Sequence, residues 1–244
     1  MARFSWLAAV AAVAAVGGTA RAEVVTTFIG TDPFQTVNVS GTNANGPRAF
    51  TSPVGPFNFL VQSDGGLGLG QTFRSFCSDY FQDVGLGNDY IYTPIPFETL
   101  PDINGNPTKV QKVQELFDRF YDVANTDATG AAFQLALWEI LYDPTNTNLS
   151  NGNFTAIGPG DPTGIAIAQN WLNTIGDSSI PDPAQKYSLL GLYSVSAQDQ
   201  ILVGPAPVPA PAGVILLVIG AGALIARRRL AGKTEVVTED EVKA

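Results

Sequence analysis

The segment Ala131-Ala-Phe-Gln-Leu-Ala-Leu-Trp-Glu-Ile-Leu-Tyr142 marks the point where the chain reads as helix. It predicts a helix that begins after Asp127 or Thr129 and stops at Pro144, because proline cannot continue a helix. Helical spacing also continues on both sides of this segment, whereas strand-like patterns lie further out. The middle of the chain is therefore expected to be helical, with strands before and after it.

Two further helices are predicted beside it. Apolar residues at helical spacing indicate one over about residues 108–124. The other is expected to start with Asp161 as N-cap and Pro162 in the first turn, and to end at Gly176. Together these helices define a helical part over residues 108–176.

Strand-like segments precede and follow the helical part. They are rich in β-branched and aromatic residues and are separated by Gly, Pro, Asn and Asp clusters, as is typical of strands joined by turns. The predicted strands cover residues 24–29, 57–61, 71–77, 89–92, 187–195 and 199–203. With no internal repeat, the sequence predicts one α+β domain over residues 23–203. It would have a β-sandwich or barrel part (23–107 and 187–203) with an inserted helical subdomain of about three helices.

Composition excludes several kinds of function. The chain has no histidine, which removes the usual imidazole general base and most zinc sites. Residues 23–206 carry 18 acidic and 6 basic side chains, a net charge of −12, so nucleic acid is a poor partner. No cofactor and no metal site is predicted. The single cysteine cannot form an intramolecular disulfide.

The first 22 residues have the pattern of a signal peptide. A basic start at Arg3 is followed by an apolar run and by the small-residue sequence Ala20-Arg21-Ala22, so cleavage is expected before Glu23. An uncleaved membrane anchor is the alternative, although the apolar run is short for a membrane span. We expect export through the inner membrane.

A second targeting signal is predicted at the other end. A proline-rich spacer covers residues 204–212, an apolar helix with an arginine cluster covers 213–229, and a tail follows over 230–244. This order resembles the PEP-CTERM sorting signal of Gram-negative bacteria. The resemblance implies an exosortase-like processing enzyme, transient membrane anchoring and a final place on the cell surface, outer membrane or extracellular matrix. A simple single-span anchor is the alternative. The predicted signal residues are Val208, Pro209, Ala210, Pro211, Arg227, Arg228 and Arg229.

Two short sequences could carry chemistry, Phe76-Cys77-Ser78-Asp79 after a strand and Phe133-Gln134-Leu-Ala136-Leu-Trp138-Glu139 on the central helix. They resemble the Cys-Gln thioester-forming domains of bacterial surface adhesins. Here Gln134, Ala136 and Trp138 match the family's helical element, whereas Phe133 stands where the family has Thr. The resemblance implies a thioester between Cys77 and Gln134, supported by Trp138, Ala136 and Phe76.

The chemistry of this pair can be stated without the family. A thiolate is the nucleophile of choice at neutral pH, and a carboxamide held against it can lose ammonia in near-attack geometry. The product would be opened once by an amine or other nucleophile on a host, cell or matrix ligand. We therefore predict a covalent adhesin and not an enzyme.

Other interpretations stay open from the sequence alone. Cys77 also fits an inert buried thiol, and Trp138 fits a core residue under either interpretation. Asp79 and Glu139 either assist proton transfer or form local caps and pairs. The rival function is a non-covalent structural or carbohydrate-binding protein of an exopolysaccharide or biofilm matrix, without a thioester. A hydrolase comes third, since no pair of carboxylates stands out.

Overall fold

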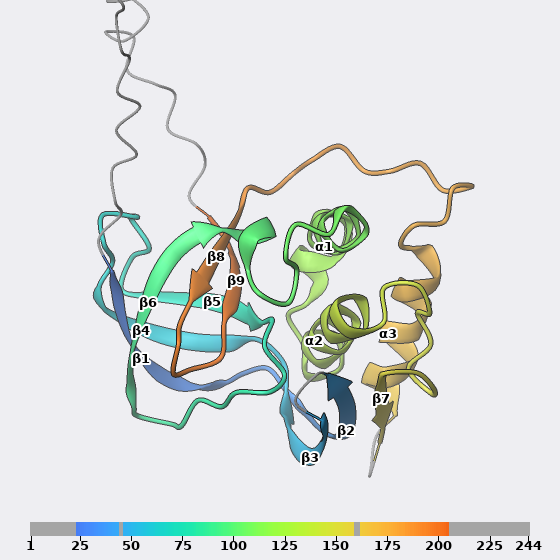
Figure 1. The fold of residues 1–244 in the computed structure, drawn as a ribbon, viewed down its shortest axis with the longest axis horizontal. Coiled ribbons are helices and arrows are strands. Elements are labelled where there is room, and N and C mark those ends of the chain that lie inside the picture. The colour runs from blue at the N-terminus through green and yellow to red at the C-terminus, as the bar shows by residue number, and fades with distance from the viewer. Residues whose placement is uncertain (1–22, 44–45, 159–161, 205–244) are drawn as a thin grey trace, which may run out of the picture. The chain divides into compact units, whose positions relative to one another are not determined.

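The computed structural model describes residues 23–43, 46–158 and 162–204, and it combines strands with helices (Figure 1). The α+β class predicted from the sequence is confirmed. Figure 1 shows a barrel on one side and the helices on the other. The predicted signal peptide, the sorting-signal residues and Asp161 lie outside the described residues.

Six antiparallel strands close into a barrel in the order β1-β4-β5-β9-β8-β6. Every barrel strand overlaps one of the segments predicted from the sequence, because each buries branched and aromatic residues on the inner face. The strand bounds are Val24–Thr31 (β1), Phe57–Ser63 (β4), Thr72–Cys77 (β5), Asp89–Pro96 (β6), Leu189–Tyr193 (β8) and Gln200–Val203 (β9).

A second, three-stranded sheet was not predicted. It has the order β3-β2-β7, with β2 at Gln35–Asn43, β3 at Gly46–Val54 and β7 at Phe154–Ile157. β7 lies inside the stretch expected to be helical, and it follows a loop that returns the chain to β2. The sheet packs on the central helix.

The helices are α1 (Pro107–Phe120), α2 (Asp127–Tyr142) and α3 (Thr163–Thr174). Asn106 caps α1 by accepting hydrogen bonds from Thr108 N and Lys109 N, and Thr126 caps α2 in a capping box with Thr129. α1 gives way to a 3₁₀ turn at Tyr121–Val123, so it ends earlier than predicted. Short 3₁₀ helix also occurs at Phe97–Thr99.

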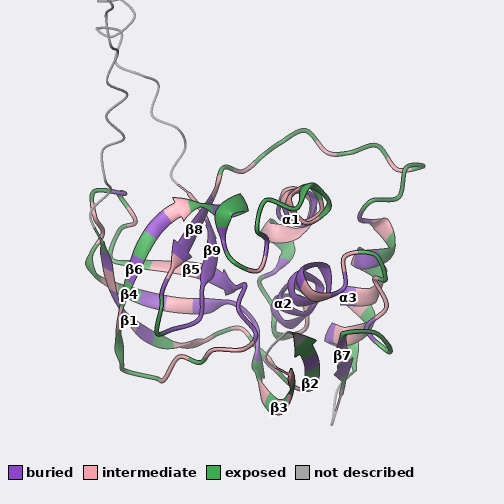
Figure 2. Ribbon diagram, in the orientation of Figure 1, coloured by how far each residue is buried: buried purple, intermediate pink, exposed green. Residues whose placement is uncertain are grey.

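The core is centred on α2, which lies between α1 and α3 (Figure 1). Figure 2 shows this helix as the most completely buried element, and every residue from Gly130 to Leu141 is buried. The second sheet and the end of β5 cover its remaining faces. A helix that is apolar nearly all round is expected in such a position. Among the described residues, no helix combines the length and apolar character that a membrane span requires.

Candidate functional site

Cys77 is the last residue of β5, at the end of the barrel that faces α2. Its backbone pairs with Gln200 of β9, and its side chain is fully buried. Phe76, the preceding residue, packs against the rings of Phe117, Tyr121 and Phe133 in the helical part. The strand therefore delivers the thiol to the boundary between barrel and helices.

Gln134 of α2 is also fully buried, and its carboxamide lies against the backbone of Cys77. The Cys77 N–H donates to Gln134 Oε1 at 2.9 Å, and Gln134 Nε2 donates to the Cys77 carbonyl at 2.8 Å. These two hydrogen bonds fix the carboxamide in one plane and one orientation. The structure thus brings together two residues that are 57 positions apart in the sequence.

The residues preceding each member of the pair also meet. The rings of Phe76 and Phe133 lie 4.1 Å apart between centroids, and Phe117 of α1 packs edge-on against both. Such aromatic contacts add rigidity as well as buried area. Phe133 therefore packs α2 against β5 and α1.

The surroundings of the Cys77 sulfur are nearly dry. The thiol donates to the Asp79 carbonyl at 3.0 Å. Burial raises the pKa of the Cys77 thiol well above its ordinary value, the nearby Asp79 charge adds to this, and the indole N–H of Trp138 acts in the opposite direction. Trp138 Nε1 itself is buried without a regular hydrogen-bond partner in the described part of the chain. The indole N–H of Trp138 thus acts on a thiol that resists ionisation.

Three hydrogen bonds, made by Tyr142 and Gln198, hold the loop after Cys77. Tyr142 Oη of α2 accepts from the Tyr80 N–H at 3.0 Å and donates to the Ser78 carbonyl at 3.3 Å. Gln198 Nε2 donates to the Asp79 carbonyl at 3.3 Å. The sequence analysis missed Tyr142 and Gln198, and no local pattern marks either, because their partners are distant in the chain.

The two acidic residues next to the pair behave differently. Asp79 Oδ1 accepts a hydrogen bond from the Phe81 N–H at 2.8 Å, which is the local cap considered from the sequence, and burial raises its pKa. Glu139 is fully buried, and neither carboxylate oxygen has a hydrogen-bond partner among the described residues. Burial, with the charge of Asp143, raises the pKa of Glu139 to about 8.

Ala136 and Trp138 lie on α2 with Gln134, as the resemblance implied, and both are buried. Trp138 packs edge-on against Tyr80 at 5.4 Å between ring centroids. Ala136 makes no polar contact and serves as a small core residue. No group of three or more His, Cys, Asp or Glu residues able to hold a metal ion occurs within the described ranges.

The chain matches no family model, no curated protein and no solved structure in the three comparisons made. The arguments about its function therefore rest on the geometry of its own residues.

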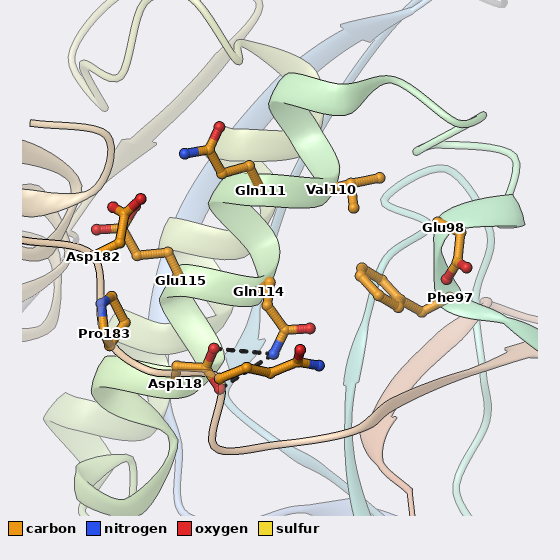
Figure 3. A pocket seen from close by; sticks show the side chains of 10 residues that line it. Phe97, Glu98, Val110, Gln111, Gln114, Glu115, Asp118, Asp182 and Pro183 are labelled. Carbon is orange, nitrogen blue, oxygen red and sulfur yellow. Dashed lines mark hydrogen bonds between the residues drawn. The ribbon is translucent and has the colours of Figure 1, made fainter. Parts of the chain in front are cut away.

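A separate cavity of about 410 Å³ lies on the outer side of α1, against the segment that leads from α3 to β8 (Figure 3). Its wall combines Phe97, Val110 and Pro183 with carboxylates and amides. Figure 3 shows the Gln114 amide donating to the carboxylate of Asp118, at 3.1 Å to each oxygen. Neither Cys77 nor Gln134 lines this cavity.

Proposed function

We propose that this chain is an exported bacterial surface protein whose Cys77 and Gln134 form an internal thioester for covalent attachment to a ligand. The observation that carries the proposal is the pair of hydrogen bonds between the Gln134 carboxamide and the Cys77 backbone, at 2.9 and 2.8 Å in a fully buried site. A glutamine in such a place has lost contact with water, and its partner is the residue that bears the thiol.

Thioester formation needs no cofactor. The Cys77 sulfur attacks the Gln134 carboxamide carbon, the bond from carbon to Nε2 breaks, and the nitrogen leaves as ammonia with the thiol proton. Pre-positioning of the two groups supplies the main advantage, because both are fixed before reaction. Burial then protects the thioester from water.

Attachment is the second step. A primary amine on the ligand attacks the thioester carbonyl carbon, the carbon–sulfur bond breaks, and the proton lost by the amine goes to the sulfur. The products are an amide between ligand and Gln134 and a free thiol at Cys77. Each molecule reacts once, so this is adhesion and not turnover.

Surface display follows from the ends of the sequence. In this proposal, residues 1–22 direct export, and residues 204–229 hold the chain in the membrane until an exosortase-like enzyme processes it. The final location is the cell surface, the outer membrane or the surrounding matrix of a Gram-negative cell. The acidic composition of residues 23–206 suits an exposed, soluble ectodomain.

The intact mass of residues 23–204, purified without denaturation, tests the thioester. We expect a mass lower than calculated by one ammonia, and we expect methylamine to raise it by one methylamine. Cys77→Ala and Gln134→Ala should have their calculated masses and should not react. Gln200→Met is the matched control, because Gln200 is also buried and pairs with Cys77 across the strands; it should keep the mass loss. A full calculated mass for the wild type, with one titratable thiol, contradicts the proposal.

The cavity beside α1 favours a second candidate function, non-covalent binding of a carbohydrate in a matrix. Its volume of about 410 Å³, its amides and carboxylates and the ring of Phe97 suit a sugar, which needs both hydrogen bonds and an apolar surface. Calorimetric titration with matrix polysaccharide tests this function. Binding that is lost in Gln111→Ala and retained in Cys77→Ala would favour it over the thioester.

A further inference from the structure

A second cavity, of about 370 Å³, lies where the barrel meets the three-stranded sheet. It is bordered by β1 and β4 on the barrel side, by β3 on the sheet side and by the loop after Cys77. Its lining includes Phe28, Arg48, Phe50, Ser52, Phe57, Trp138 and Gln198. Neither Cys77 nor Gln134 lines this cavity, which reaches the Cys77 site through Trp138 and Gln198.

Trp138 and Gln198 are the most deeply placed polar groups of this lining. They are 2% and 6% exposed, respectively. Gln198 donates a hydrogen bond to the Asp79 carbonyl, and the same carbonyl accepts a hydrogen bond from the Cys77 thiol. Trp138 Nε1 makes no hydrogen bond of regular geometry within the described residues, although its N–H acts to lower the pKa of the Cys77 thiol. A buried N–H without a partner is costly, so its position calls for a functional explanation.

The wall formed by β3 is built by strand alternation. Arg48, Phe50 and Ser52 are half-buried, whereas Ala49 between them is exposed. These three residues share one face of β3 and border the cavity, and Thr51 and Pro53 at the end of the strand border it as well, whereas Ala49 does not.

Arg48 holds the mouth of the cavity in shape. Its Nη2 pairs with Asp83 Oδ1 at 2.6 Å, and its Nη1 donates to the Tyr80 carbonyl at 3.1 Å. Its guanidinium lies over the ring of Phe50, 4.8 Å from the centroid. The loop after Cys77 is therefore fastened to β3, and the cavity between them is part of the folded structure.

Resting on the proposed thioester, we propose that this cavity is the entrance for the attacking nucleophile, and that the Trp138 indole N–H stabilises the Cys77 sulfur as it leaves. The ligand class is a primary amine on a slender, unbranched chain. Phe28 and Phe57 offer an apolar wall for the methylene groups of such a chain.

The Trp138 indole acts in the attachment step, when the amine opens the thioester. When the amine forms its bond to the Gln134 carbonyl carbon, the electron pair of the breaking carbon–sulfur bond moves to the sulfur. The Cys77 side chain is fully buried, so the new thiolate is poorly solvated. A pre-placed N–H donor meets this charge until the proton released by the amine reaches the sulfur.

The Trp138 part of the proposal is tested with Trp138→Phe, which keeps an aromatic ring at this buried position and removes the N–H together with part of the ring. We expect the thioester to form, as judged by the loss of one ammonia, and methylamine to open it about 10²-fold more slowly. The slowing should shrink as pH falls, because a sulfur protonated as it leaves needs no N–H donor. Trp171→Phe on α3 is the matched control and should react like the wild type.

The entrance is tested with Ser52→Trp, which fills the cavity, beside Ala49→Trp on the opposite face of the same strand. A lysine-containing peptide should open the thioester of Ser52→Trp about tenfold more slowly or worse, and that of Ala49→Trp at the wild-type rate. Methylamine, which is smaller, should be slowed less than the peptide.

The outcomes separate the two proposals. A wild type with its full calculated mass overturns both the thioester and its entrance. A wild type that has lost ammonia, with equal opening rates in Trp138→Phe and Ser52→Trp, overturns the entrance and the role of Trp138 while the thioester stands.

Discussion

Helices α1 and α2 are neighbours of similar length, yet they differ in how deeply their polar residues are buried. α1 buries one face, and its polar groups reach solvent or partners, as in the 2.8 Å ion pair between Arg119 and Glu115. α2 is buried from Gly130 to Leu141, and that stretch includes Gln134 and Glu139. Polar residues on α1 need no special explanation. Each polar residue on the buried part of α2 must either form a hydrogen bond or lower the stability of the fold. This difference makes α2 the informative helix.

The first prediction tests the difference in burial. Phe133→Ala on α2 should lower the free energy of unfolding by about 3–5 kcal/mol, because the side chain is fully buried between Phe76 and Phe117. Phe120→Ala, on a half-buried position of α1, should cost clearly less. Urea unfolding followed by circular dichroism measures both. Equal losses would remove the contrast between the helices.

The second prediction concerns Glu139. Its pKa is raised to about 8 in the folded protein, against about 4.3 for an exposed glutamate, so the folded state binds the proton more tightly. Its contribution to stability is therefore complete below about pH 4 and is lost as pH rises through about 8, by at most about 1.4 kcal/mol per pH unit.

Glu139→Gln should reduce this loss of stability with rising pH. The free energy of unfolding of the variant should exceed that of the wild type most at pH 8 and above. Burial also raises the pKa values of Asp102 and Asp199, each to about 7, so part of the slope should remain in the variant. Thermal unfolding at a series of pH values measures the effect. An unchanged slope would show that Glu139 is hydrated or paired in solution.

The third prediction isolates the hydrogen bonds of Gln134 from any covalent bond. In a Cys77→Ala background, Gln134→Leu leaves the N–H and the carbonyl of residue 77 without partners, at a cost of about 1–3 kcal/mol. Gln111→Leu on α1 should change stability by less than about 0.5 kcal/mol, as is usual for a surface position. Chemical denaturation of the Cys77→Ala protein, alone and with either Gln134→Leu or Gln111→Leu, compares the two sites.

The smallest effects are expected at the helix N-caps, where the helices should behave alike. Asn106→Ala at α1 and Thr126→Ala at α2 each remove a side-chain acceptor and should each cost about 1 kcal/mol. Hydrogen exchange of the first-turn amides measures the loss locally. A much larger loss at Thr126 would show that burial of α2 extends to its first turn.

The sequence predicted those elements that are marked by residues within or next to them. The barrel strands and α2 could be found because branched runs, turn clusters and Pro144 act on their own neighbourhood. β3 could not, because Pro47 and Pro53 argue against a strand, and only its place at the edge of its sheet tolerates them. β7, with four residues, is too short to show a period.

The candidate site was predicted through a resemblance and not through periodicity. Cys77 and Gln134 lie together as that resemblance implied, and the bond between them stays a prediction. Arg48 and Gln198 could not be found, because they reach the site only through the pairing of distant strands. The role of Trp138 was open for a related reason, since a buried tryptophan on a helix is ordinarily a core residue.

The closed barrel has a mechanical consequence. The described chain leaves the barrel from β9, which is hydrogen-bonded to β5 on one side and to β8 on the other. A ligand joined to Gln134 would pull on α2, and a membrane tether beyond Gly204 would pull on β9. An edge strand can be peeled away one hydrogen bond at a time, whereas a strand held on both sides must lose two ladders at once. In the proposed adhesin, the barrel would thus carry the pulling force between a ligand and the cell without releasing β9.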